Sequence, residues 1–282
     1  MTVARAVDLL GTDPELKIGY GAFNVIQLEH AEAIIAGAGS AGLPVIVQIS
    51  ENAVRYHGGL AAIGTATLIL ARDSDLPIVV HLDHAEDEHL VEEALELGFK
   101  SVMFDGSTLP WEENLARTSA ITKLCHDAGA SIEAELGEVG GKDGAHAPGV
   151  RTSPEQAAEF VATTGVDSLA VAVGTSHAMA DRSAVVDLEL VGRLAAAVPV
   201  PLVLHGSSGV DDAGLQAAVR AGIRKINIGT RLNQLMTEAV REQLAADPAL
   251  SDPRKYLGPG RTAIQTEVAR MLGLLARPDQ TS

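Results

Sequence analysis

Short apolar runs rich in β-branched residues alternate along the chain with longer segments rich in alanine, leucine and glutamate. The longer segments have helical periodicity, as in EHLVEEALELG (88–98) and QAAVRAGI (216–223), and several end at an Ala-Gly or Leu-Gly pair. The apolar runs are predicted to be eight strands, at about 19–26, 44–50, 77–83, 100–104, 131–136, 167–173, 200–205 and 223–228. This alternation predicts a parallel sheet covered by helices. Eight units favour a closed (β/α)8 barrel, or TIM barrel, over an open doubly wound sheet.

No linker or low-complexity stretch divides the chain, so residues 1–282 are expected to form a single domain. An extra C-terminal helix is expected at about 261–276, after the eighth strand–helix unit. It would cap the barrel or join a neighbouring subunit.

The net charge of the chain limits the kinds of molecule that it is expected to bind. The chain has 21 Lys and Arg against 37 Asp and Glu, a formal net charge of −16. Such acidity argues against nucleic acid and anionic membranes, but a local site can still bind a phosphorylated substrate. The single cysteine, Cys125, excludes an internal disulfide. With no signal pattern and no apolar run long enough to span a bilayer, the chain is expected to be cytoplasmic.

Three histidines lie at the ends of three separate apolar runs. His84 follows the third predicted strand, His177 the sixth and His205 the seventh. The carboxyl ends of parallel barrel strands meet at one face, where such enzymes carry their active sites. Three imidazoles with an open fourth position are typical of a catalytic zinc site.

The acidic residues near these histidines allow two interpretations each. Asp83 is either a general acid or base or a carboxylate that orients a histidine. Because strand side chains alternate, Asp83 and His84 can both face the site only if the strand ends near Asp83. Asp105 and Glu135 end the fourth and fifth strands and are either salt-bridge residues or oxygen ligands of a second metal position. His81 is interpreted as an orienting or packed histidine.

Two glycine-rich turns follow the seventh and eighth strands, HGSSGVDD (205–212) and NIGTRL (227–232). Such turns expose backbone N–H groups at a helix N-terminus and form phosphate sites in these barrels. Ser208 and Thr230 can add hydroxyl donors, although glycine and serine are also ordinary helix-capping residues. The long glycine-rich segment 137–153 suits either a mobile lid or a plain surface loop.

Taken in order, these motifs resemble the class II ketose-bisphosphate aldolases, which include fructose- and tagatose-bisphosphate aldolases. The similarity extends from about residue 1 to the segment DPRKYLGPG and the helix beyond it. The motifs that carry it are FNV (23–25), LDH (82–84), EAELG (133–137), VGTSH (173–177), LHGSSG (204–209) and KINIGT (225–230).

The resemblance implies a reversible, zinc-dependent cleavage of a ketose 1,6-bisphosphate to dihydroxyacetone phosphate and glyceraldehyde 3-phosphate. It assigns the metal to His84, His177 and His205, with Asp105 and Glu135 at an alternative metal position. It makes Asp83 the proton-transferring acid or base and Asn227 the residue that steadies the enediolate, and it makes Asp143 the nearest, though poor, match to an acid on the mobile loop. It places the substrate and its phosphate against Asn24, Ser50, Gly174, Gly206, Ser207, Ser208, Gly209, Asn227, Gly229 and Thr230. A second divalent ion, a monovalent cation and a homodimer or homotetramer are further expectations.

Departures from the family pattern bear on the substrate. Ala178 and Ser207 replace glycines, and Arg231 replaces an acidic residue. Gly229 stands where fructose-type members often carry an acid and tagatose-type members a small residue. These differences favour tagatose 1,6-bisphosphate, or another ketose 1-phosphate, over fructose 1,6-bisphosphate. They also leave open a non-catalytic accessory subunit and metal-dependent hydrolysis.

Overall fold

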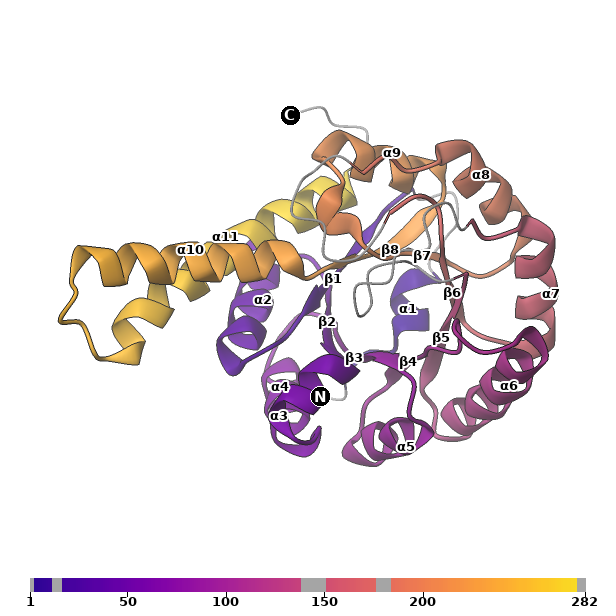
Figure 1. Ribbon diagram of the computed structural model, residues 1–282, viewed down its shortest axis with the longest axis horizontal. Helices are drawn as coiled ribbons and strands as arrows, with labels where there is room; N and C mark the ends of the chain where they lie inside the picture. The colour runs from indigo at the N-terminus through magenta and orange to yellow at the C-terminus, as the bar shows by residue number, and fades with distance from the viewer. Residues whose placement is uncertain (1–2, 12–16, 138–150, 176–183, 278–282) are drawn as a thin grey trace.

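In the computed structural model, described for residues 3–11, 17–137, 151–175 and 184–277, eight parallel strands close into a barrel (Figure 1). Each strand pairs with the next along the chain, and the last pairs with the first. This confirms the predicted (β/α)8 barrel. The strands are β1 Tyr20–Asn24, β2 Val45–Ser50, β3 Ile78–Ala85, β4 Ser101–Phe104, β5 Ser131–Leu136, β6 Ser168–Val171, β7 Leu202–Leu204 and β8 Ile223–Ile228.

The helices lie around the barrel, except that the short first helix covers one of its ends and the last two project to one side (Figure 1). They are α1 Ala6–Leu10, α2 Leu28–Ala41, α3 Glu51–His57, α4 Ala61–Arg72, α5 Glu88–Leu97, α6 Trp111–Asp127, α7 Pro154–Thr164, α8 Leu188–Ala197, the 3-10 turn η1 Ser207–Gly209, α9 Asp212–Ala221, α10 Thr230–Ala246 and α11 Pro253–Ala276. None of the described helices is long and apolar enough to cross a membrane.

The helix that contains QAAVRAGI ends at Ala221, as the Ala221-Gly222 pair predicts, because Gly222 takes a φ of 134° and the chain enters β8 at Ile223. One predicted helix boundary was wrong. The C-terminal helix begins at Pro253 rather than near 261 and continues through Pro259. Gly260 allows α11 to pack closely against α10 at this point, since a side chain there would collide with Met236 of α10. Close packing of α11 against α10 thus overrides the local helix-breaking signal.

The barrel interior is apolar at its base and polar toward the carboxyl ends of the strands. At the base, α1 packs Ala6, Leu9 and Leu10 against Ala22, Ile46 and Val79. Higher up, the inward-facing positions carry histidines, carboxylates, amides and one lysine. The outward-facing side chains of the strands form the main core with the surrounding helices. The fold therefore collects polar groups from many strands at one end of an otherwise apolar barrel.

Helices α2 and α11 pack closely at Gly37, where an added Cβ would lie 2.8 Å from the Gln265 carbonyl oxygen and 2.8 Å from Val268 Cβ. We predict that Gly37→Ala lowers the free energy of unfolding by about 1–3 kcal/mol, because the two helices must separate. Gly39→Ala on the same helix is the matched control, since an added Cβ there meets nothing within 4 Å. That control should stabilise the protein by up to about 1 kcal/mol through helix propensity. Urea unfolding of both variants measures the difference, and equal effects would contradict the packing argument.

Candidate active site and metal centre

A bulge in β3 brings two consecutive side chains to the same site. The pairing of β3 with β4 runs from Leu82 opposite Val102 to Ala85 opposite Phe104, so β3 carries one extra residue. Within that step His84 takes a φ of 51°, the only positive φ of a described residue other than glycine. The expectation that the strand ends near Asp83 was therefore wrong, because it continues to Ala85. The bulge, and not an early end of the strand, allows Asp83 and His84 to lie in one cluster with His205.

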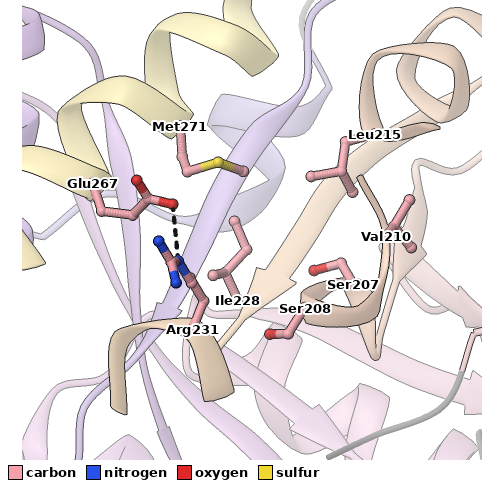
Figure 2. A pocket seen from close by; sticks show the side chains of 8 residues that line it. All are labelled: Ser207, Ser208, Val210, Leu215, Ile228, Arg231, Glu267 and Met271. Atoms are coloured by element: carbon pink, nitrogen blue, oxygen red, sulfur yellow. Dashed lines mark hydrogen bonds and ion pairs between the residues drawn. The ribbon is translucent and has the colours of Figure 1, made fainter. Parts of the chain in front are cut away.

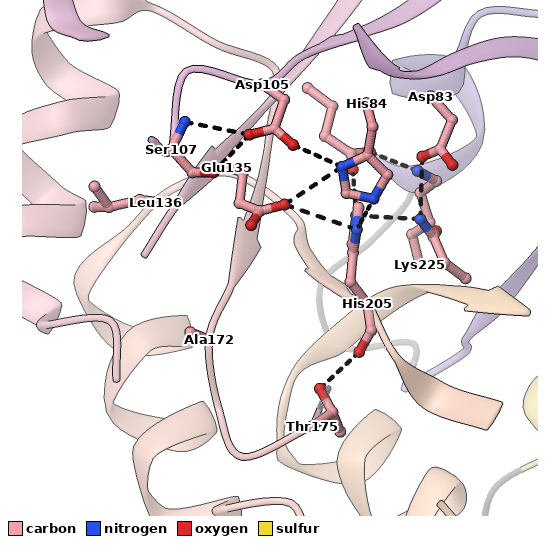
Figure 3. Close-up of polar contacts among 12 residues, drawn as sticks. Asp83, His84, Asp105, Ser107, Glu135, Leu136, Ala172, Thr175, His205 and Lys225 are labelled. Carbon is pink, nitrogen blue, oxygen red and sulfur yellow. Dashed lines mark hydrogen bonds and ion pairs between the residues drawn. The ribbon is translucent and has the colours of Figure 1, made fainter. Parts of the chain in front are cut away.

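The two described histidines of the predicted metal site face each other. His205 Nδ1 lies 2.9 Å from His84 Nε2, with the rings edge to face (Figure 3). On its other side, His84 Nδ1 lies 2.7 Å from Asp105 Oδ2 and 3.7 Å from a Glu135 carboxylate oxygen. Asp105 is itself held by the backbone N–H and hydroxyl of Ser107. A carboxylate at Nδ1 favours the tautomer that leaves the Nε2 lone pair of His84 pointing at His205.

The charge of the interior fits a divalent cation. Asp83, Asp105, Glu133 and Glu135 are at most 3% exposed, and Lys225 is the only fully buried lysine or arginine among the described residues. Four buried carboxylates against one ammonium leave a strong negative excess that burial makes costly. Asp83, His84 and His205 offer ligand atoms within 4.8 Å of one another, as do His84, Asp105 and Glu135. Imidazole and carboxylate donors in this arrangement suit Zn2+.

Three amide side chains hold Asp83. Gln48 Nε2 and Asn24 Nδ2 each lie 3.2 Å from Asp83 Oδ2, and Asn227 Nδ2 lies 3.4 Å from Oδ1. Gln48 also donates to Asn24 Oδ1 at 3.0 Å. These donors come from β1, β2 and β8, so the carboxylate is fixed from three strands. These hydrogen bonds fix the position and orientation of the buried Asp83 carboxylate.

The turns after β7 and β8 lie beside this cluster. Gly206, at a φ of 65°, opens η1, and the buried Ser207 hydroxyl donates to the Asn227 carbonyl oxygen. Thr175 Oγ1 donates to the His205 carbonyl oxygen at 2.6 Å. The described hydroxyl contacts of Ser207 and Thr175 therefore fix the backbone around His205 and Asn227. Gly229 and Thr230 form the start of α10 directly after β8.

A small pocket of about 20 Å³ lies beside η1 (Figure 2). Ser208 and Arg231 line it, and Arg231 Nε makes a 3.5 Å contact with Glu267 of α11. The remaining lining residues are Ser207, Val210, Leu215, Ile228, Glu267 and Met271. The turns predicted to bind phosphate thus border a hollow that contains a cationic side chain.

The other predicted site residues lie as follows. Ser50 is the last residue of β2, and its hydroxyl accepts from the Ala53 N–H as the N-cap of α3. Gly174 has a φ of 111°, and an added Cβ there would lie 2.6 Å from the Val185 carbonyl oxygen. Gly209 is the last residue of η1. His177, Asp143 and Ala178 lie outside the described residues, as does most of the segment 137–153.

Sequence reasoning missed three polar residues deeper in the barrel: Gln48, Glu133 and Lys225. Burial raises the pKa of Glu133, but the Lys225 ammonium and the His205 hydrogen bond outweigh it and hold that pKa well below its usual range. Burial, reinforced by Lys225, lowers the pKa of His81 well below its ordinary value, so this packed histidine is neutral. For Glu133, the alternation in SIEAEL could have indicated an inward position, because Glu133 and Glu135 share one face of a buried strand.

Comparisons with known proteins agree with this site. The family described as "Fructose-bisphosphate aldolase class-II" matches residues 5–280. The fructose-bisphosphate aldolase of Geobacillus stearothermophilus is 38% identical over 272 residues, covering 95% of both chains. The crystal structure of the YdjI aldolase from Escherichia coli K12 superposes with a TM-score of 0.85 at 30% identity, covering 98% of this chain and 97% of that one. Fructose-bisphosphate aldolase from Campylobacter jejuni, at 22% identity and a TM-score of 0.82, shares the fold.

A barrel with a histidine–carboxylate cluster at the carboxyl ends of its strands defines a class of metal-assisted barrel enzymes. Within that class, this chain belongs to the class II fructose-bisphosphate aldolase family. It is therefore an aldehyde-lyase of carbohydrate metabolism, from a family that acts on phosphorylated sugars and generally depends on zinc.

We predict that His84→Ala lowers the metal content, because one of the predicted ligands is lost and Asp105 is left without its imidazole partner. Metal stoichiometry after dialysis, measured by atomic emission, tests this. His89→Ala is the matched control, since that side chain is 90% exposed. Equal metal content in the two variants would contradict a ligand role for His84.

We predict that Gly229→Ala lowers turnover by about 10- to 100-fold, because the added Cβ would lie 2.8 Å from Asn24 Oδ1 and displace that residue from Asp83. The backbone itself tolerates alanine, since φ is −127°. Gly258→Ala, where a Cβ meets nothing within 4 Å, is the control. Steady-state release of dihydroxyacetone phosphate measures the effect, and wild-type turnover in Gly229→Ala would rule out this role of the glycine.

Proposed function

We propose that this chain catalyses the reversible, zinc-dependent aldol cleavage of a ketose 1,6-bisphosphate of the tagatose or fructose type, giving dihydroxyacetone phosphate and glyceraldehyde 3-phosphate. One observation carries the proposal. A carboxylate held by amides from three strands, Asp83, lies in the same cluster as the facing imidazoles of His84 and His205. Family membership and a fructose-bisphosphate aldolase relative at 38% identity support the reaction class.

In this proposal His84, His205 and the predicted third ligand His177 hold Zn2+. When bound, the zinc ion supplies a Lewis acid that draws negative charge from the ketose carbonyl. Asp105 orients His84 by accepting from Nδ1, and with Glu135 it provides oxygen atoms for an alternative cation position.

Asp83 performs the proton transfer. In the cleavage direction it takes the proton of the C4 hydroxyl as the C3–C4 bond breaks and the bonding electrons stay with the C3 fragment. In the condensation direction it returns that proton to the aldehyde oxygen. The Asn227 amide, beside both Asp83 and His205, steadies the enediolate. The proton that the C3 carbon then takes up is assigned to the loop acid, for which Asp143 is the nearest sequence candidate.

A lysine Schiff base is not part of this proposal. The one fully buried lysine among the described residues, Lys225, has its ammonium 2.7 Å from a Glu133 carboxylate oxygen. An ammonium paired in this way cannot act as a free amine nucleophile.

We assign the substrate phosphate to the turns after β7 and β8. Gly206, Ser207, Ser208, Gly209, Gly229 and Thr230 supply backbone N–H groups and hydroxyls there, with Ser50, Asn24 and Gly174 at neighbouring strand ends. The absence of a side chain at Gly229 favours tagatose 1,6-bisphosphate. We further propose that residues 1–282 act as one domain, in a cytoplasmic homodimer or homotetramer.

The proposed reaction is tested by release of dihydroxyacetone phosphate from fructose and tagatose 1,6-bisphosphates, assayed side by side with and without a chelator. We expect cleavage that the chelator abolishes and added Zn2+ restores. The ratio of the two rates identifies the preferred sugar. Cleavage that is insensitive to the chelator would refute metal dependence, and no cleavage of either sugar by zinc-loaded protein would refute the substrate assignment.

We predict that Asp83→Asn keeps the bound metal but lowers turnover by about 100- to 10,000-fold, because the amide cannot accept the hydroxyl proton. Metal stoichiometry and kcat, measured on the same preparation, separate the two effects. Asp127→Asn, on the exposed end of α6, is the control. An Asp83→Asn variant with unchanged kcat would eliminate Asp83 as the acid or base.

A further inference from the structure

A charged pair is enclosed inside the barrel beneath the candidate metal centre. Lys225 of β8 is 0% exposed and Glu133 of β5 is 2% exposed, and Lys225 Nζ donates to Glu133 Oε2 at 2.7 Å. Strands β5 and β8 are not neighbours in the sheet, so the pair spans the barrel interior. Burying two charges is costly, and such a pair is weak evidence for stability alone.

The direction of the Lys225 ammonium is fixed by a second acceptor. Its Nζ lies 3.3 Å from His81 Nε2, and an ammonium can only donate, so this ring nitrogen accepts. His81 Nδ1 then carries the hydrogen and donates to Ser101 Oγ at 2.7 Å. The lysine is therefore oriented from β3 and β4 as well as from β5.

The second oxygen of Glu133 reaches the metal centre. Glu133 Oε1 lies 3.0 Å from His205 Nε2, and the opposite ring nitrogen, Nδ1, faces His84 Nε2. An ionised carboxylate only accepts, so it requires the hydrogen of His205 on Nε2 and leaves the Nδ1 lone pair toward His84. The Asn227 amide nitrogen also lies 3.1 Å from Nε2, but the charged acceptor forms the stronger interaction.

We propose that Lys225 and Glu133 are positioning residues that fix the tautomer and ring orientation of His205, and thereby set its affinity for the metal. The role of Lys225 is to hold the Glu133 carboxylate in place through the 2.7 Å hydrogen bond from Nζ to Oε2, which leaves Oε1 directed at His205 Nε2. A glutamine at position 133 would give its single oxygen to the ammonium and turn its amide N–H groups toward His205 Nε2. The ring hydrogen would then move to Nδ1 and an N–H would face His84. This inference depends on the metal site of the proposed function, but not on the substrate or the reaction.

The proposal is tested on metal-free full-length protein with Lys225→Met, Glu133→Gln and the double variant. Histidine 15N chemical shifts report the His205 tautomer, and titration with Zn2+ alone, in competition with a chromophoric chelator, reports the affinity. We expect the Nε2–H tautomer in the wild type, the Nδ1–H tautomer in Glu133→Gln, and a mixture of the two in Lys225→Met, where the carboxylate is no longer anchored. We expect Zn2+ affinity to fall by about 10- to 100-fold in each, the usual cost of losing a carboxylate that orients a metal-binding histidine. The double variant should lose no more than the worse single variant, because both changes act through His205.

Val203→Ala is the matched control, since Val203 is a fully buried interior residue of β7, the strand that His205 follows. It should destabilise the fold while leaving the tautomer and the Zn2+ affinity within about 2-fold of wild type. Glu133→Gln keeps the size of the side chain and so remains informative if Lys225→Met does not fold. An unchanged tautomer in Glu133→Gln, or a loss of affinity matched by Val203→Ala, would overturn the proposal. If the variants change the tautomer and the Zn2+ affinity as expected, but zinc-loaded wild-type protein cleaves no ketose bisphosphate, the proposed function is refuted and this inference stands.

Discussion

The constraint on which this site depends is that a charge inside a closed barrel has no bulk water to solvate it. Each buried carboxylate must therefore be met by a cation or by hydrogen-bond donors. Asp83 is met by amides, Asp105 by Ser107 and an imidazole, and Glu133 by Lys225 and an imidazole. Satisfying these groups forces side chains from most of the strands to converge. The same requirement that makes the interior costly to fold thus organises it for catalysis.

The geometry of β3 shows how the fold resolves a conflict between strand alternation and chemistry. Two adjacent residues of a regular strand point to opposite faces, yet the proposed proton-transfer group and the proposed metal ligand are adjacent, at Asp83 and His84. A strained φ of 51° at His84 is the local cost, and residues held in such regions persist where the surroundings over-determine them. Here the Asp105 carboxylate and the His205 ring fix His84 from two sides. The bulge thus belongs to the site as much as the side chains do.

The sequence was sufficient for the barrel and for the residues at the strand ends, because β-branched runs mark strands and polar residues that end them stand out. It was insufficient where tertiary packing overrides a local signal, as at Gly260, whose contact with Met236 carries α11 through Pro259. It also missed Gln48, Glu133 and Lys225, since a polar residue in the middle of an apolar run reveals its partner only when strands distant in sequence are brought together. The bulge at His84 could not be predicted, because no glycine marks the positive φ.

An acidic protein that binds an anionic sugar must concentrate its positive potential locally. The buried carboxylates at the ends of β3, β4 and β5 cannot supply it, and for this reason we assign phosphate recognition to the turns after β7 and β8. Arg231 lines the pocket beside these turns, but its ion pair with Glu267 weakens the positive potential that it contributes there. Glu267 in turn pairs with Arg270, which pairs with Asp212. The potential at the pocket is therefore set by a network reaching across α9, α10 and α11, so substrate preference can change without altering the residues that break the carbon–carbon bond.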